Sequence, residues 1–198
     1  PQTFVSPDRR LFAIIGAAAG LALAFAASFL REQLRSRPRN AADIASLTDL
    51  PVLGEVPPAA RGVTLPETVR RDPEGSIAES VRAIAASLRF VSVDRPLKVI
   101  LVTSPEPAEG KSSIVPALGL TMAAAGRRTL LIDADLRNPR LAPTLGIEGA
   151  IGLTTVLVGD VALAEAAQPW GDENLWVLTG GAKSPNPGQL ISSGQLAV

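Results

Sequence analysis

The sequence contains no cysteine and no histidine, and only 4% of its residues are aromatic. These absences exclude thiolate nucleophiles, imidazole bases and the usual zinc ligands, so catalytic groups must come from Lys, Arg, Asp, Glu, Ser or Thr. The 19 basic residues balance 19 acidic ones, and zero net charge gives no sign of a nucleic-acid partner. A chain of 198 residues can hold one domain and some accessory segments.

Residues 11–30, LFAIIGAAAGLALAFAASFL, carry no charge. An α-helix rises about 1.5 Å per residue, so this run matches the roughly 30 Å hydrocarbon core of a bilayer. We predict a transmembrane helix; a buried core helix and a signal peptide are the alternatives. More arginines follow the run (Arg31, Arg35, Arg37 and Arg39) than precede it (Arg9 and Arg10). This bias favours a periplasmic, proline-containing end at residues 1–10 and a cytoplasmic location for the rest.

Gly16 and Gly20 are separated by three alanines inside this run. A face of small residues lets two membrane helices approach closely, which suggests self-association. Small residues are also common in membrane helices that do not pair, so both interpretations stay open.

Residues 31–73 alternate charged residues with proline and glycine and lack a long apolar period. We predict a cytoplasmic juxtamembrane linker that holds one short helix at 41–47 and one extended piece at 52–56. Residues 74–198 have a different pattern, which predicts a folded domain.

Apolar residues at 77, 81, 84, 88 and 91 recur at helical spacing and predict an amphipathic helix over 74–91. The short apolar run 97–103, LKVILVT, predicts a buried parallel strand. Further along we predict a helix at 112–125, a strand at 129–132, helices at 151–158 and 161–167, and a strand at 175–178. This alternation indicates an α/β fold with a mostly parallel sheet flanked by helices.

The segment 104–113, SPEPAEGKSS, joins the predicted strand to the predicted helix. Backbone N–H groups of such a loop surround phosphate, while Lys111 reaches the β- and γ-phosphates and Ser112 offers a hydroxyl to magnesium. The strict signature requires glycine where Pro105 stands, so a chance tripeptide at a helix start is the alternative. The predicted nucleotide-binding residues are Pro107, Ala108, Glu109, Gly110, Lys111, Ser112, Ser113 and Arg137.

Asp133 and Asp135 follow the predicted strand 129–132 and are two residues apart, which places them on one side of an extended chain. At the carboxyl end of a parallel strand they would meet the nucleotide, and a close carboxylate pair requires a cation such as Mg²⁺. The predicted metal ligands are therefore Ser112, Asp133 and Asp135. A solvated aspartate-rich turn is the alternative, and Arg137 could pair either with these acids or with phosphate.

These segments resemble the bacterial tyrosine kinases (BY-kinases) of polysaccharide co-polymerases. SPEPAEGKSS is similar to that family's Walker A loop, LLIDADLRNPRL to its Walker A′ motif, and GGAKSPNPGQLISS to its Pro-Asn-Pro loop. ESVRAIAASLRF resembles the helix with the E-x-x-R-x-x-R oligomerisation motif, where Glu79 and Arg82 match. LPVLGEVP and SPDRR resemble the segments that flank the family's second membrane helix.

The resemblance implies a P-loop domain that uses ATP and Mg²⁺ for protein-tyrosine autophosphorylation, with Lys111, Asp133 and Asp135 as catalytic residues. It also implies a bacterial inner-membrane protein with a cytoplasmic kinase domain that forms homo-oligomers and phosphorylates in trans. The implied partners are the polymerase and export machinery of capsule or exopolysaccharide synthesis. We expect an internal piece of a longer protein, with the Walker B aspartate and acceptor tyrosines outside it, so that the piece is inactive alone.

Four positions depart from the family pattern: Ala85, Ala108, Pro116 and Ala117. Ala85 replaces the last arginine of the helix motif, and Ala108 replaces a loop glycine. These changes motivate an alternative function, a kinase-inactive chain-length regulator with an ATP-binding assembly module. A partition or septum-positioning ATPase is a third hypothesis, disfavoured because no lysine precedes Lys111 in the loop and because a membrane segment is present.

Overall fold

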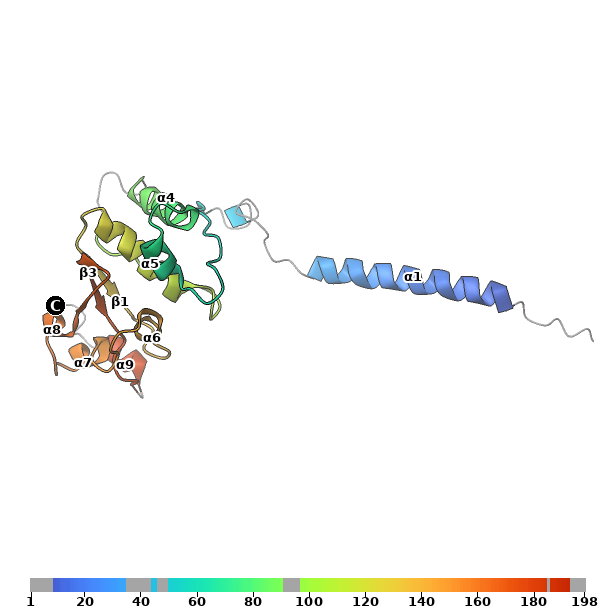
Figure 1. Cartoon of the computed structure of the whole chain (residues 1–198). Coiled ribbons are helices and arrows are strands. Elements are labelled where there is room, and N and C mark those ends of the chain that lie inside the picture. Colours follow the sequence, from blue (N-terminus) through green and yellow to red (C-terminus); the bar gives the residue numbers. More distant parts are fainter. Residues whose placement is uncertain (1–8, 35–43, 46–49, 91–96, 185, 193–198) are drawn as a thin grey trace, which may run out of the picture. The chain divides into compact units, whose positions relative to one another are not determined.

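The computed structural model describes residues 9–34, 44–45, 50–90, 97–184 and 186–192 (Figure 1). The chain divides into two compact units, with the boundary between Pro51 and Val52. The second unit therefore includes residues 52–73, which the sequence indicates as a linker.

The first unit contains helix α1 (Arg9–Leu34). Within it, Arg9–Arg31 is long and apolar enough to cross a membrane, and none of its most apolar window is buried by protein. The predicted helix is confirmed and extends past 11–30 at both ends. Of the helix predicted at 41–47, only Ile44 and Ala45 are described, and both are helical.

Three helices form one side of the second unit: α3 (Leu65–Arg71), α4 (Ser76–Phe90) and α5 (Lys111–Ala124). α4 buries Ala78 and Val81, and these residues form a core cluster with Val69 of α3 and Leu118 of α5. The helices predicted at 74–91 and 112–125 are confirmed. α3 was not predicted, although its N-cap Thr64 accepts the N–H of Glu67 at 3.4 Å, a spacing visible in the sequence.

The sheet has the order β1-β3-β2 and consists of β1 (Thr129–Ile132), β3 (Asp172–Leu178) and β2 (Gln168–Trp170). β1 and β3 are parallel, whereas β2 pairs with β3 in the antiparallel direction. The α/β class is confirmed, and the described sheet is mixed. Both predicted strands at 129–132 and 175–178 are present.

α5 lies between α4 and the sheet (Figure 1). Its Gly119 faces Leu131 of β1, and a Cβ at position 119 would lie 2.8 Å from the Leu131 Cδ2 atom. The missing side chain therefore sets how closely the helix approaches the strand. Pro116 lies inside α5 and is fully buried, so the helix continues past a residue that cannot donate its backbone hydrogen bond.

Short helices gather where β1 and β3 end: α6 (Leu141–Leu145), α7 (Leu153–Leu157) and α9 (Pro187–Ser192), with α8 (Leu163–Ala166) beside α7 (Figure 1). α7 and α8 confirm the predicted helices at 151–158 and 161–167. The N–H of Leu153 donates to the Thr179 oxygen at 2.7 Å, which fixes α7 to the segment after β3.

The strand predicted at 97–103 is wrong. These residues have no strand assignment, and the side chains of Val99 and Leu101 are 85% and 83% exposed. A strand requires a neighbouring strand for its backbone hydrogen bonds, and no strand of the described sheet pairs with this segment. The segment 52–56, predicted as a short extended piece, has no helix or strand assignment, and its Val56 packs against the α3–α4–α5 cluster.

Candidate active site

The first feature of the site is the N-terminus of α5. Gly110 caps this helix with φ 94° and ψ 7°, and no side chain bonds to the cap. The N–H groups of Ser113 and Ile114 bond to the Gly110 oxygen, both at 2.9 Å. Among the described residues, the N–H groups of Lys111 and Ser112 have no acceptor. Free N–H groups at a helix N-terminus favour an anion such as phosphate.

Lys111 closes the loop that precedes α5. Its Nζ donates to Ser104 Oγ at 2.6 Å, and Ser104 Oγ donates to the Glu106 oxygen at 2.7 Å. Ser104 was not predicted from the sequence as the partner of Lys111. The two residues are seven positions apart, and only the folded loop brings their side chains together. A phosphate oxygen is a stronger acceptor for an ammonium group than a hydroxyl, so Lys111 can exchange Ser104 for a phosphate.

Ala108 has a φ of 65°, and it is the one residue other than glycine with a positive φ in the described part of the chain. An L-residue in this left-handed region costs roughly 1–2 kcal/mol. The glycine that the family resemblance places here would adopt the same conformation without that cost. The loop therefore carries local strain at a residue predicted to bind nucleotide.

Asp133 and Asp135 differ in burial and in hydrogen bonding, although they are only two residues apart. Asp133 is only 7% exposed, and its carboxylate accepts three backbone N–H groups. Oδ1 accepts from Asp135 at 3.2 Å, and Oδ2 accepts from Arg140 and Leu141, both at 2.8 Å. The Asp133 side chain thus holds the loop from β1 to the start of α6.

Asp135 is exposed and its Oδ1 accepts the Asn138 N–H at 3.1 Å. Its Oδ2 accepts no hydrogen bond from any residue that the structure describes, so this oxygen is available to a cation. The Ser112 hydroxyl and a carboxylate are the oxygen ligands that Mg²⁺ prefers. In the described ranges, no group of three or more His, Cys, Asp or Glu residues forms a metal cluster, and neither aspartate pairs with Lys111 or Arg137.

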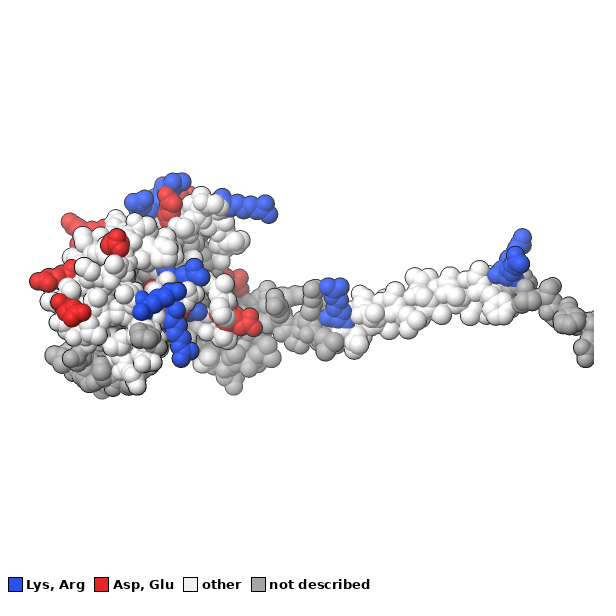
Figure 2. All heavy atoms as spheres, turned by 90° about the horizontal axis from the view of Figure 1, so that it is seen from below, with Lys and Arg blue, Asp and Glu red and all other residues white. Residues whose placement is uncertain are grey.

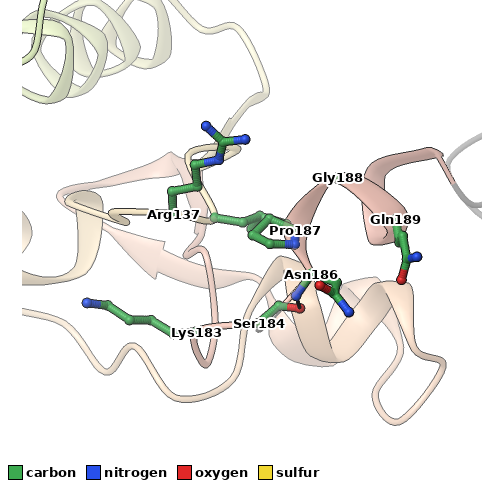
Figure 3. Close-up of a pocket in the computed structure, with 8 residues that line it drawn as sticks. Arg137, Lys183, Ser184, Asn186, Pro187, Gly188 and Gln189 are labelled. Carbon is green, nitrogen blue, oxygen red and sulfur yellow. Dashed lines mark hydrogen bonds between the residues drawn. The ribbon is translucent and has the colours of Figure 1, made fainter.

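One open pocket of about 590 Å³ is lined by Arg137 and by residues 183–184 and 186–189, which lie far apart from it in the sequence (Figure 3). Arg137 follows β1, whereas Lys183, Ser184 and Asn186 follow β3. The sequence resemblance pointed to the Pro-Asn-Pro loop, but Lys183 and its placement beside Arg137 were missed. Only the register of β1 against β3, with Ile132 opposite Leu178, brings the two segments together.

A loop of glycine and lysine that opens a helix on an α/β sheet defines a P-loop nucleotide-binding domain. No protein-family model matches the sequence. Tyrosine-protein kinase YwqD of Bacillus subtilis (strain 168) is 39% identical over 122 residues, which are 62% of this chain and 52% of that protein. Tyrosine-protein kinase ptk of Acinetobacter johnsonii is 26% identical over 201 residues, covering 96% of this chain and 27% of that protein.

Among solved structures, the chimerical protein CapA2B2 superposes with a TM-score of 0.72 at 30% identity, and the match covers 80% of this chain and 67% of that one. The chain belongs to the family of bacterial tyrosine kinases. It spans about half the length of YwqD.

Proposed function

We propose that this chain is the anchoring and nucleotide-binding part of an ATP-dependent protein-tyrosine kinase. The observation that carries the proposal is the α5 N-terminus, where the N–H groups of Lys111 and Ser112 have no acceptor among the described residues and the lysine side chain lies across the loop. The similarity to named tyrosine kinases supports the reaction class.

The proposed roles follow from the contacts of each side chain. The residues 107–113 surround the phosphates, and Lys111 stabilises the transferred phosphoryl group. Ser112 and the Asp135 Oδ2 atom, which accepts no hydrogen bond from the described residues, would hold Mg²⁺, and the ion would supply charge neutralisation during transfer. Arg137, which was predicted to contact the nucleotide, pairs with no acid among the described residues. Its guanidinium is therefore available to an anionic partner, either a phosphate or a carboxylate.

Asp135 is also the better candidate for the group that accepts the proton of the acceptor hydroxyl. Both aspartates were predicted to be catalytic, but the Asp133 carboxylate already accepts three backbone N–H groups. Its two oxygens are therefore already engaged, whereas the Asp135 Oδ2 atom accepts no hydrogen bond from the residues that the structure describes. The acceptor tyrosine must come from outside these residues, because the sequence contains none.

We further propose that α1 anchors the protein in the bacterial inner membrane with residues 52–198 in the cytoplasm, where ATP is present. The arginines that follow α1 support this orientation. The resemblance to polysaccharide co-polymerases extends the proposal to homo-oligomers that act with polymerase and export proteins of capsule or exopolysaccharide synthesis.

The test is phosphotyrosine formation by the full-length protein with labelled ATP. We expect labelling that is abolished by Lys111→Met and retained by the control Lys98→Met, because Lys98 is exposed and lies before the loop. Nucleotide binding without phosphotyrosine would instead favour the kinase-inactive assembly module.

A further inference from the structure

The pocket between the segments that follow β1 and β3 has no role assigned to it as a whole. We propose that it binds an acidic stretch of the acceptor polypeptide and so selects tyrosines that have carboxylates nearby. This inference rests on the proposed kinase function and specifies its substrate class.

The charge of the pocket is the first argument. Among the described residues that line it, Arg137 and Lys183 are ionisable and both are basic, and none is acidic. In the described part of the chain neither cation forms an ion pair. Figure 2 shows basic side chains gathered in the middle of the lower face of the second unit, with acidic side chains towards its edges. A face of this kind attracts anionic partners.

The directions of the two side chains argue for an extended ligand. Arg137 and Lys183 start on either side of the pocket and project apart rather than towards one point (Figure 3). One phosphate group requires donors that converge on it. Separated cations, with Asn186 also in the lining of the pocket, instead match carboxylates spaced along a polypeptide.

The position of the pocket connects it to the reaction. Arg137 is two residues after Asp135, and the intervening Leu136 is buried and fixes the loop. On the other side, a Cβ at Gly180 would lie 2.6 Å from the Pro139 Cβ, so the segment after β3 packs directly on the Asp133–Arg140 loop. A chain that presents its tyrosine near Asp135 would therefore pass over Arg137 and Lys183 with its neighbouring residues.

The experiment compares two peptides of equal length with one tyrosine each, flanked by glutamates in the first and by glutamines in the second. With the full-length protein, we expect the KM for the glutamate peptide to be about two- to fivefold lower, which is within the range for an exposed charge pair. Lys183→Glu should remove this preference while the KM for ATP stays unchanged. The matched control Arg127→Glu, an exposed arginine before β1, should retain it.

Three results would overturn the inference. The first is equal use of both peptides by the unmodified protein. The second is a Lys183→Glu variant that keeps the glutamate preference. The third is a Lys183→Glu variant whose KM for ATP rises together with the peptide KM, since this would assign the pocket to the nucleotide.

Binding measurements separate this inference from the kinase proposal. Fluorescence anisotropy with labelled peptides that carry phenylalanine instead of tyrosine requires no phosphoryl transfer. If no peptide is phosphorylated but the glutamate peptide binds more tightly than the glutamine peptide, and Lys183→Glu removes the difference, the acidic site stands while the kinase proposal fails. Equal binding of the two peptides overturns the site even in an active kinase.

Discussion

The Asp133 Oδ2 atom accepts the backbone N–H of Leu141 at 2.8 Å, although the two residues are eight positions apart. This bond, together with those from Asp135 and Arg140, makes Asp133 the residue that holds the β1–α6 loop in place. The exposed Asp135 lies on this loop, so the geometry of the proposed metal ligand depends on its buried neighbour.

We expect Asp133→Ala to lower the free energy of unfolding by about 2–4 kcal/mol, because it leaves buried N–H groups without their charged acceptor. Asp135→Ala removes one exposed bond and should cost less than about 1 kcal/mol. Urea unfolding of both variants measures the difference. Equal losses would show that the two carboxylates do not have separate roles. If Asp133→Ala fails to fold, Asp133→Asn takes its place in the experiment, because its amide keeps one acceptor oxygen. We expect this variant to fold and to unfold at a lower urea concentration than the unmodified protein.

The strain at Ala108 gives a second prediction. Ala108→Gly relieves a left-handed alanine but adds the chain entropy of glycine, so the free energy of unfolding should rise by about 0.5–1 kcal/mol. The control Ala150→Gly, an exposed loop residue without positive φ, should not raise stability. If Ala108→Gly leaves the free energy of unfolding unchanged or lowers it, the left-handed backbone of Ala108 does not destabilise the protein.

The matching residues of the oligomerisation motif are bonded to each other. Arg82 Nε and Nη2 donate to Glu79 Oε2 at 3.0 and 2.7 Å, and Arg82 Nη1 donates to the Pro73 oxygen. Because this pair is partly exposed, we expect Arg82→Ala to change the free energy of unfolding by less than about 1 kcal/mol. Light scattering on the same samples reports assembly. A large loss of stability would mean that Arg82 is needed for the fold itself, and a smaller oligomer at unchanged stability would locate an interface there.

The long elements could be predicted from the sequence. α1, α4 and α5 have sustained apolar patterns. The loop that ends in Gly110 and Lys111 was predictable as well, because a phosphate-binding glycine and lysine stand at the start of a helix. The run 97–103 has the composition of a strand as well, but composition does not say whether a partner strand lies within reach. β2 is three residues long and contains Pro169, which suits an edge position and hides the strand from pattern analysis.

The short elements and half of the site depend on contacts between distant residues. α6 begins where Asp133 accepts the N–H of Leu141, and Thr179 Oγ1 donates to the Ile151 oxygen at 2.9 Å just before α7. For the same reason the sequence could name Asp133 and Asp135 but not separate them. The two have the same chemistry, and only the fold buries one and exposes the other.

The central claim is that Lys111 binds the phosphates of ATP at the start of α5. Isothermal titration of the chain with a non-hydrolysable ATP analogue, with and without Mg²⁺, tests it most directly. We predict binding that Mg²⁺ strengthens and that Lys111→Met weakens by about tenfold or more, the equivalent of losing one charge-assisted hydrogen bond. Lys98→Met should bind like the unmodified chain. Equal affinity of the Lys111→Met variant, or no binding by any form, would contradict the account.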